Sequence, residues 1–282
     1  MSGGGGRVAA VLQCCPNGAR PADVYPAVPM SPRHLARDAR AVAALGVQSL
    51  HVHPRDRDGQ ESLAPGVIGT VVGTIRREAP ELEIGVTTAR WVEPDPFKRT
   101  ELIAQWGKLP KHARPDVAAV NVHERGWQGV CAALDAVGIG VELGVWTTGD
   151  AVQLKQAGLP RGTVRVLAEV TVTDPDTAVA EAVRILKALG PVPAPILLHG
   201  EEGGTWPVLE YAKRNNLDTR IGFEDTLKGP DGTWLATGNE ELVRYAQGKD
   251  VAGRYERRRS GSRTGGLFTS GRWPGSRAEH RR

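Results

Sequence analysis

The sequence of 282 residues has little cysteine and no long apolar segment, and each shortage excludes a class of protein. The three cysteines, Cys14, Cys15 and Cys131, are an odd number at spacings that suit neither a disulfide framework nor a CxxC pair. We expect them to be small core residues. No apolar run approaches the roughly 18 residues of a membrane span, and residues 1–7 lack the pattern of a secretory signal. We therefore expect a cytoplasmic protein.

Three common functional motifs are also missing. The chain has no phosphate-binding P-loop, no GxSxG nucleophile elbow and no GxGxxG between an expected strand and helix. Phosphoryl transfer by a P-loop, serine hydrolysis and nicotinamide binding therefore lack their usual markers.

Positive charge is present but concentrated at one end of the chain. The formal net charge is +4, yet residues 251–282 alone hold nine arginines and two glutamates, a net charge of +7, which leaves about −3 for residues 1–250. The body of the chain therefore lacks a basic surface for nucleic acid. Gly, Ser and Arg bury too little apolar area to offset chain entropy. We expect a disordered tail at 251–282, a flexible N-terminus at 1–6 and one folded domain at 7–250.

Short β-branched segments alternate with amphipathic ones along the folded domain. The expected strands are residues 7–13, 47–53, 83–88, 116–122, 138–145, 164–170, 195–199 and 218–223. The expected helices begin at Ser31-Pro32, an N-cap followed by proline, and continue near 64–79, 96–108, 127–137, 149–157, 174–189, 205–214 and 238–247. Eight such units in about 250 residues, with continuously apolar strands, favour a TIM barrel over the competing doubly wound sheet.

Two histidines end the second expected strand. Active sites of TIM barrels are built at the C-terminal ends of the strands, where His51 and His53 stand. Residues two apart in a strand project to one face, so both imidazoles can bind one metal ion, such as zinc. The alternative is two unrelated histidines, one in the core and one in a loop.

A third ligand would hold such an ion firmly and leave a position open for substrate. The carboxylates at strand ends are Glu124, Glu142, Glu169, Glu224 and Asp225. In a closed barrel the first and last strands are neighbours, so the eighth strand lies one strand away from the second. This geometry favours Glu224.

Two residues beside Glu224 could act on a substrate. Asp225 could serve as a base, and Arg220, on the same face as Glu224, could hold a substrate carboxylate through two hydrogen bonds. An internal ion pair between Arg220 and one of these carboxylates is an equally strong alternative.

Other strand ends carry polar residues with less specific signals. Thr87 and Thr88 could bind a carbonyl or carboxylate oxygen, or could simply be ordinary strand residues. Asn121 could orient a substrate or close a turn. His199 could be a metal ligand, a general acid or a core histidine.

Together these motifs resemble the β-keto acid cleavage enzymes, also called 3-keto-5-aminohexanoate cleavage proteins. The matching segments, within roughly residues 7–247, are Pro29-Met30-Ser31-Pro32, His51-Val52-His53-Pro54-Arg55-Asp56 with Gly59, Thr87-Thr88, Asn121, Leu198-His199-Gly200 and Arg220-Ile221-Gly222-Phe223-Glu224-Asp225-Thr226. The HxHxRD and RxGxED motifs are specific when both occur at this separation.

The resemblance implies a TIM barrel, commonly a homotetramer, that binds zinc and converts a β-keto acid and acetyl-CoA into acetoacetate and a new CoA thioester. Zinc would bind the oxygens of the keto acid and stabilise an enolate. By resemblance, the metal ligands are His51, His53 and Glu224, the catalytic residues are Arg220 and Asp225, and Thr87 contacts the substrate.

Departures from the family pattern bear on the substrate. Thr88-Ala89-Arg90 stands where members often have Thr-Gly-Gly, which adds a cation, and Arg20 stands near a position that is acidic in lysine-fermenting members. The residues expected to contact the substrate are Thr87, Thr88, Arg90, Asn121 and Arg20. We predict a neutral or anionic keto acid without an amino group.

Two other functions are open at this point. The same ligand set could serve another metal-dependent aldolase or hydrolase. Alternatively, the basic tail could bind nucleic acid or a protein partner, although its aromatic residues are only Tyr255, Phe268 and Trp273, so it offers charge more than base stacking. We expect no nucleic acid and no membrane as partner.

Overall fold

A computed structural model describes residues 10–21 and 23–248 of the chain. The predicted tail at 251–282 and the predicted flexible N-terminus at 1–6 lie outside the described residues. Among the helices of the described ranges, none has the length and apolar character that crossing a membrane requires.

Eight parallel strands form a closed barrel in which each strand pairs with the next and β8 pairs with β1. The strands are β1 (Leu12–Cys14), β2 (Ser49–Val52), β3 (Glu83–Thr87), β4 (Val117–Asn121), β5 (Gly140–Val145), β6 (Thr163–Val170), β7 (Ile196–Gly200) and β8 (Asp218–Ile221). This confirms the predicted TIM barrel and excludes a doubly wound sheet, which has open edges.

The first strand differs most from its predicted range of 7–13. Residues 7–9 of that range lie outside the described residues. Within the described chain the strand begins at Leu12, because the N–H groups of Val11 and Leu12 donate to the side chains of Asp218 and Gln48 and not to a neighbouring strand. It continues to Cys14, so the strand leads directly into the loop that approaches the end of β8.

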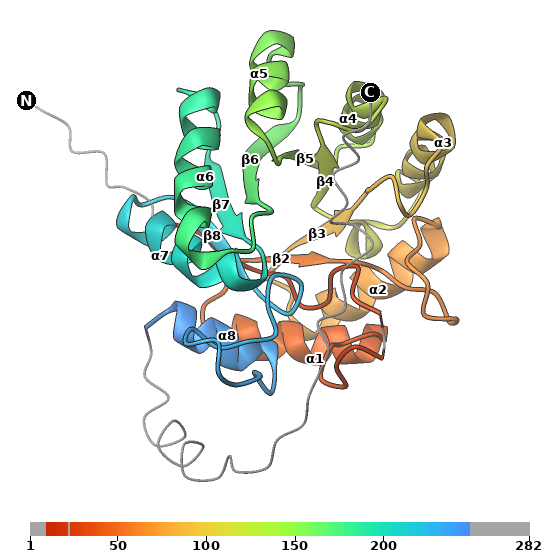
Figure 1. Ribbon diagram of the computed structural model, residues 1–282. Helices are drawn as coiled ribbons and strands as arrows, with labels where there is room; N and C mark the ends of the chain where they lie inside the picture. Colours follow the sequence, from red (N-terminus) through yellow and green to blue (C-terminus); the bar gives the residue numbers. More distant parts are fainter. Residues whose placement is uncertain (1–9, 22, 249–282) are drawn as a thin grey trace, which may run out of the picture.

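The helices surround the barrel on its outside (Figure 1). They are α1 (Pro32–Ala43), α2 (Pro65–Glu78), α3 (Pro96–Trp106), α4 (Trp127–Ala136), α5 (Thr148–Ala157), α6 (Pro175–Leu189), α7 (Thr205–Arg214) and α8 (Asn239–Ala246), with 3-10 helices at Lys111–Ala113 and Glu202–Gly204. The predicted cap at Ser31 is present, since its side chain accepts a hydrogen bond from the backbone N–H of His34.

Side chains alternate between the two faces of the barrel wall. Residues that face outward, such as Leu50 and Val52, are fully buried against the helices. Inward-facing residues include pairs of polar side chains in register, among them Glu142 beside Arg165. The barrel interior is therefore polar, and its C-terminal end carries the residues predicted to perform chemistry.

The cysteines are buried with free thiols, as predicted. Burial raises the pKa of all three, that of Cys131 to about 12. Because the thiolate is the reactive form, none of the three is poised as a nucleophile.

Candidate metal centre

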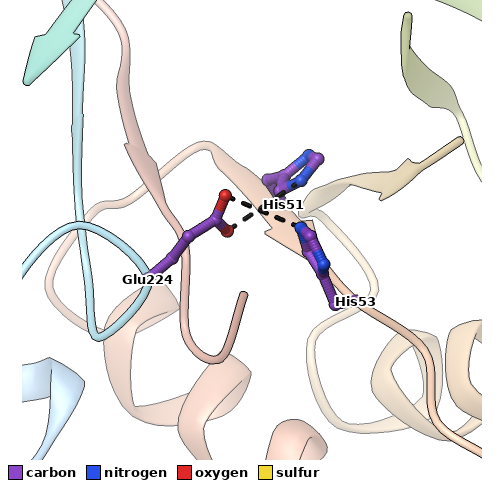
Figure 2. Close-up of side chains that lie close together, drawn as sticks. All are labelled: His51, His53 and Glu224. Atoms are coloured by element: carbon purple, nitrogen blue, oxygen red, sulfur yellow. Dashed lines mark ion pairs between the residues drawn. The ribbon is translucent and has the colours of Figure 1, made fainter. Parts of the chain in front are cut away.

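His51 and His53 lie at the C-terminal end of β2, and both are buried. Glu224 follows β8, and β1 lies between β8 and β2, as the sequence predicted. Figure 2 shows the two imidazoles and the Glu224 carboxylate pointing toward one another. Closure of the barrel thus brings together three side chains, although His51 and Glu224 are 173 residues apart in the sequence.

The three side chains present their ligand atoms at distances suited to a small metal ion. Nε2 of His51 is 3.9 Å from Oε2 of Glu224, and Nε2 of His53 is 3.6 Å from Oε1. A tetrahedral zinc ion holds neighbouring ligand atoms about 3.3–3.5 Å apart. Within the described ranges, this is the one group of at least three His, Cys, Asp or Glu side chains whose ligand atoms lie this close together.

An unpartnered oxygen supports the fit of a cation. Oε2 of Glu224 is buried and has no hydrogen-bond partner. A buried carboxylate oxygen is costly without a partner. Two imidazole nitrogens and one carboxylate are a donor set that zinc binds with a position left open for substrate. The residues therefore fit a divalent metal.

The loop after β1 fixes this arrangement. The amide of Asn17 donates to the His53 carbonyl at 2.8 Å and accepts from the His53 N–H at 3.0 Å. Gly18 has a φ of +58° and packs so closely on the Glu224 side chain that a Cβ would overlap it. Gly222 likewise lies against the carbonyl of Cys15, which accepts the N–H of Glu224.

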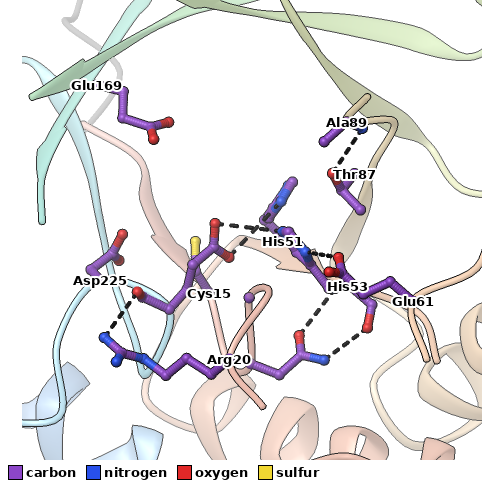
Figure 3. Close-up of polar contacts among 12 residues, drawn as sticks. Cys15, Arg20, His51, His53, Glu61, Thr87, Ala89, Glu169 and Asp225 are labelled. Atoms are coloured by element: carbon purple, nitrogen blue, oxygen red, sulfur yellow. Dashed lines mark hydrogen bonds and ion pairs between the residues drawn. The ribbon is translucent and has the colours of Figure 1, made fainter. Parts of the chain in front are cut away.

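Each histidine also turns its other ring nitrogen toward a carboxylate. Nδ1 of His53 is 2.5 Å from Oε1 of Glu61, while Nδ1 of His51 is 3.9 Å from Oε2 of Glu142, beyond hydrogen-bond distance. The indole N–H of Trp91 donates to the second oxygen of Glu61 at 3.2 Å. Figure 3 shows Glu61 beside His53 at this edge of the site. A carboxylate behind a ligating histidine fixes the orientation of the ring and raises its basicity.

Replacing Glu61 with glutamine is therefore expected to weaken zinc binding by about 10- to 100-fold, because the hydrogen bond that orients His53 loses its charge. Chelator competition on the purified variant measures the dissociation constant. Glu101→Gln, at an exposed position of α3, is the matched control and should bind zinc like the unchanged protein. An equal zinc affinity in Glu61→Gln would contradict a role for Glu61 behind His53.

The protonation states of the three residues suit metal binding. Burial lowers the pKa of His51 to about 3, so its imidazole is neutral. Burial opposes protonation of His53 as well, but the carboxylates of Glu224 and Glu61 raise its pKa to about 9. Burial also opposes ionisation of Glu224, yet Arg220 and the two histidines hold the pKa of its carboxyl well below the usual value. Binding a metal therefore displaces a proton from His53.

Arg220 lies between two carboxylates. It is buried, and its guanidinium is 3.0 Å from Oε1 of Glu224 and 2.9 Å from Oδ1 of Asp225. Of the two interpretations that the sequence left open, the structure shows the internal ion pair. Arg220 therefore fixes one metal ligand and the adjacent acid at the same time, and leaves Oδ2 of Asp225 without a hydrogen-bond partner.

Three other carboxylates that we considered as ligands from the sequence contact other residues. Glu124 forms a buried ion pair with Arg99. Glu142 accepts a hydrogen bond from the Gln13 amide at 3.0 Å. Glu169 lies 3.3 Å from His199. None of the three joins the group around His51.

The two threonines at the end of β3, Thr87 and Thr88, differ in what their hydroxyls contact. Thr88 donates its hydroxyl to the Ala119 carbonyl at 2.6 Å, so it joins β3 to β4. The hydroxyl of Thr87 accepts the Ala89 N–H at 3.2 Å, which leaves its own proton for another acceptor (Figure 3). The side chain of Arg90 is exposed. Contact of these residues with a substrate stays a prediction.

Asn121 and Arg20, also predicted to contact substrate, have structural partners. The Asn121 amide donates to Glu124 at 3.0 Å. Arg20 is buried, donates to the carbonyl of Phe223 and forms an ion pair with Glu202 at 2.6 Å. Arg20 thus supports the loop that carries Glu224, and a substrate contact for either residue stays a prediction.

Sequence reasoning missed two residues that the structure places at this site: Asn17 and Glu61. Asn17 stands in a Pro-Asn-Gly segment that is typical of a turn, and Glu61 lies eight residues after His53 in a loop. An acidic residue shortly after an HxH strand end was the available signal for Glu61.

A family model for beta-keto acid cleavage enzymes matches residues 9–258, so the match extends into the segment predicted as a tail. No curated protein matches the chain.

Solved structures with a similar fold include two complexes of ObcA. The ternary complex of ObcA with a C4-CoA adduct and oxalate has a TM-score of 0.61 at 16% identity, over 82% of this chain and 65% of that chain. The binary complex with oxaloacetate has a TM-score of 0.60 at 16% identity, over 82% and 64%. This chain therefore spans less than two thirds of the length of ObcA. 3-Dehydroquinate dehydratase from Geobacillus kaustophilus HTA426 has a TM-score of 0.56 at 11% identity, over 90% and 93%. These likenesses show the barrel fold.

Proposed function

The chain belongs to the beta-keto acid cleavage enzyme family, and from this premise we propose that it transfers the acyl group of a β-keto acid to CoA. A keto acid R–CO–CH2–COO⁻ and acetyl-CoA give acetoacetate and the thioester R–CO–S-CoA, so all atoms are accounted for. The observation that carries the proposal is the group of His51, His53 and Glu224 at the C-terminal end of the barrel. A structure of ObcA with a C4-CoA adduct supports a CoA thioester as one substrate.

We propose zinc as the metal, held by His51, His53 and Glu224. When bound, the ion supplies Lewis-acid stabilisation of negative charge on a carbonyl oxygen. The chain's own residues keep the ligands in place. Asn17 clamps the backbone of His53, and Glu61 orients its ring. The fixed ligands then do not need to reorganise as the reaction proceeds.

Asp225 is proposed as the base that removes a proton from the methylene group of the keto acid. Its carboxylate is fully buried and held through Oδ1 by Arg220, which leaves Oδ2 to accept a proton. The same guanidinium of Arg220 contacts Asp225 and Glu224, which links the proposed base to a proposed metal ligand. Removing the methylene proton gives the carbanion that attacks the carbonyl of acetyl-CoA.

We further propose that the keto acid carries no amino group. An ammonium group would need an acidic partner, but the carboxylates of Glu124, Glu142 and Glu169 are engaged by Arg99, Gln13 and His199. Turnover of unaminated β-keto acids is therefore expected to exceed that of 3-keto-5-aminohexanoate. Comparison of kcat/KM for chain-matched substrates measures this, and a clear preference for the aminated acid would overturn it.

The proposed function is tested by supplying a panel of β-keto acids with acetyl-CoA and following acetoacetate and the new thioester. Both products should form in equal amounts with at least one keto acid. The zinc-free protein serves as control and should form neither. Failure of every keto acid in the panel to give both products with the zinc-loaded protein would refute the proposal.

A further inference from the structure

A network of polar side chains lies inside the barrel next to His51 and has no role in the reaction proposed above. Glu142 of β5 is fully buried at its centre. Oε1 of Glu142 accepts a hydrogen bond from the Gln13 amide at 3.0 Å and lies 3.4 Å from Nη1 of Arg165. The Gln13 amide also donates to the Ser49 hydroxyl at 3.0 Å. Glu142 is therefore held in place through one of its two carboxylate oxygens.

The network continues to Glu83 at the start of β3, the end of that strand away from the metal centre. Glu83 accepts a hydrogen bond from the Ser49 hydroxyl at 2.8 Å and forms an ion pair with Arg165. Burial raises the pKa of Glu142, but the charge of Arg165 and the hydrogen bond from Gln13 favour its ionised form. Side chains from five strands thus fix one carboxylate inside the barrel.

The second oxygen of Glu142 faces His51. Oε2 is 3.9 Å from Nδ1 of His51, both atoms are buried, and neither has a hydrogen-bond partner. This separation is longer than a hydrogen bond but too short for a bridging water, which needs two bonds of about 2.8 Å each at an open angle. A buried polar atom is costly without a partner. Each of these two atoms therefore offers what the other lacks.

The chemistry of a ligating imidazole requires an acceptor at this position. Nε2 of His51 faces Glu224 and is the nitrogen that the site offers to a metal. A neutral imidazole has one N–H, so a ring that gives the lone pair of Nε2 to a metal carries its proton on Nδ1. In His51 that proton faces Oε2 of Glu142.

We propose that Glu142 is a positioning residue for the metal: in the metal-loaded protein its Oε2 accepts the Nδ1–H of His51. A movement of about 1 Å brings the two atoms from 3.9 Å to hydrogen-bond distance. Each histidine ligand then has its own carboxylate, Glu61 from a loop for His53 and Glu142 from the barrel interior for His51. The inference rests on the metal ion of the proposed function and not on the proposed reaction.

Glu142→Gln is expected to weaken zinc binding by about 10- to 100-fold, because the amide keeps the shape of the side chain but lacks the charge that orients His51. Chelator competition measures the dissociation constant. The matched control is Glu83→Gln, which removes a carboxylate of the same network that contacts Ser49 and Arg165. This control should bind zinc like the unchanged protein. Equal zinc affinities of Glu142→Gln and Glu83→Gln would overturn the proposal.

A measurement on the unchanged protein keeps the proposal testable if Glu142→Gln does not fold. The protein, labelled with 15N at its histidines, is loaded with 113Cd, whose coupling to 15N identifies the two metal-bound rings. Both rings should show a downfield Nδ1 proton, as expected for a hydrogen bond to a carboxylate.

A downfield Nδ1 proton on only one of the two rings would refute the role of Glu142. Failure of the unchanged protein to bind zinc or cadmium would refute the metal centre and this inference together. If both rings behave as expected but no β-keto acid is turned over, the proposed reaction falls and the role of Glu142 stands.

Discussion

Replacing Asp225 with asparagine is expected to lower kcat by about 10²- to 10⁴-fold, while the purified protein keeps its metal. Asparagine has nearly the same shape and can still accept a hydrogen bond from Arg220, but it cannot take up a proton at neutral pH. The metal should stay because Asp225 does not belong to the group of ligands around His51. Steady-state kinetics and metal analysis of the same sample check both parts.

The control for this change is Asp58→Asn, at an exposed position in the loop after β2, which should leave kcat unchanged. A variant Asp225→Asn with the kcat of the unchanged protein would rule out Asp225 as the base. Loss of metal from the variant would instead show that Asp225 acts by supporting Glu224.

Replacing Arg220 with methionine is expected to lower the free energy of unfolding by about 3–5 kcal/mol. The guanidinium is 3% exposed and contacts Glu224 at 3.0 Å and Asp225 at 2.9 Å, so its loss leaves two buried carboxylates without their shared cation. Lysine at this position should restore part of the loss, because it keeps the charge but lacks the planar fork that reaches both partners. Urea denaturation of the metal-free proteins measures the difference without a contribution from bound zinc.

Arg244→Met is the matched control for this stability change. Arg244 forms an ion pair with Glu240 one turn earlier on α8, and the two side chains are 41% and 46% exposed. Such a pair contributes at most about 1 kcal/mol. If Arg220→Met is destabilised no more than Arg244→Met, the buried network around Arg220 does not stabilise the fold.

The barrel and the grouping of the three proposed metal ligands could be predicted from the sequence because both depend on local patterns. Apolar strands alternating with helices fix the order of the elements, and an HxH pair at a strand end places two imidazoles on one face. Closure of the barrel then brings the end of β8 within one strand of β2, which selected Glu224 from five carboxylates. No detail of loop conformation was needed for that choice.

Partners within the site could not be predicted, since they depend on how loops fold back over the barrel. Glu61 reaches His53 only because the loop after β2 turns back. Arg20 points to Glu202 and the loop after β8, although its charge suggested a substrate contact. The hydroxyl of Thr88 joins two strands. In each case the side chain has a partner that is distant in sequence, and only the packed structure shows it.

The central claim is that His51, His53 and Glu224 together hold one zinc ion, and metal analysis tests it most directly. The purified protein should contain one zinc per chain, and both His51→Ala and Glu224→Ala should contain almost none. His34→Ala, which removes an exposed histidine of α1, is the control and should retain the full amount. Unchanged zinc content in His51→Ala and Glu224→Ala, with both variants folded, would contradict the account.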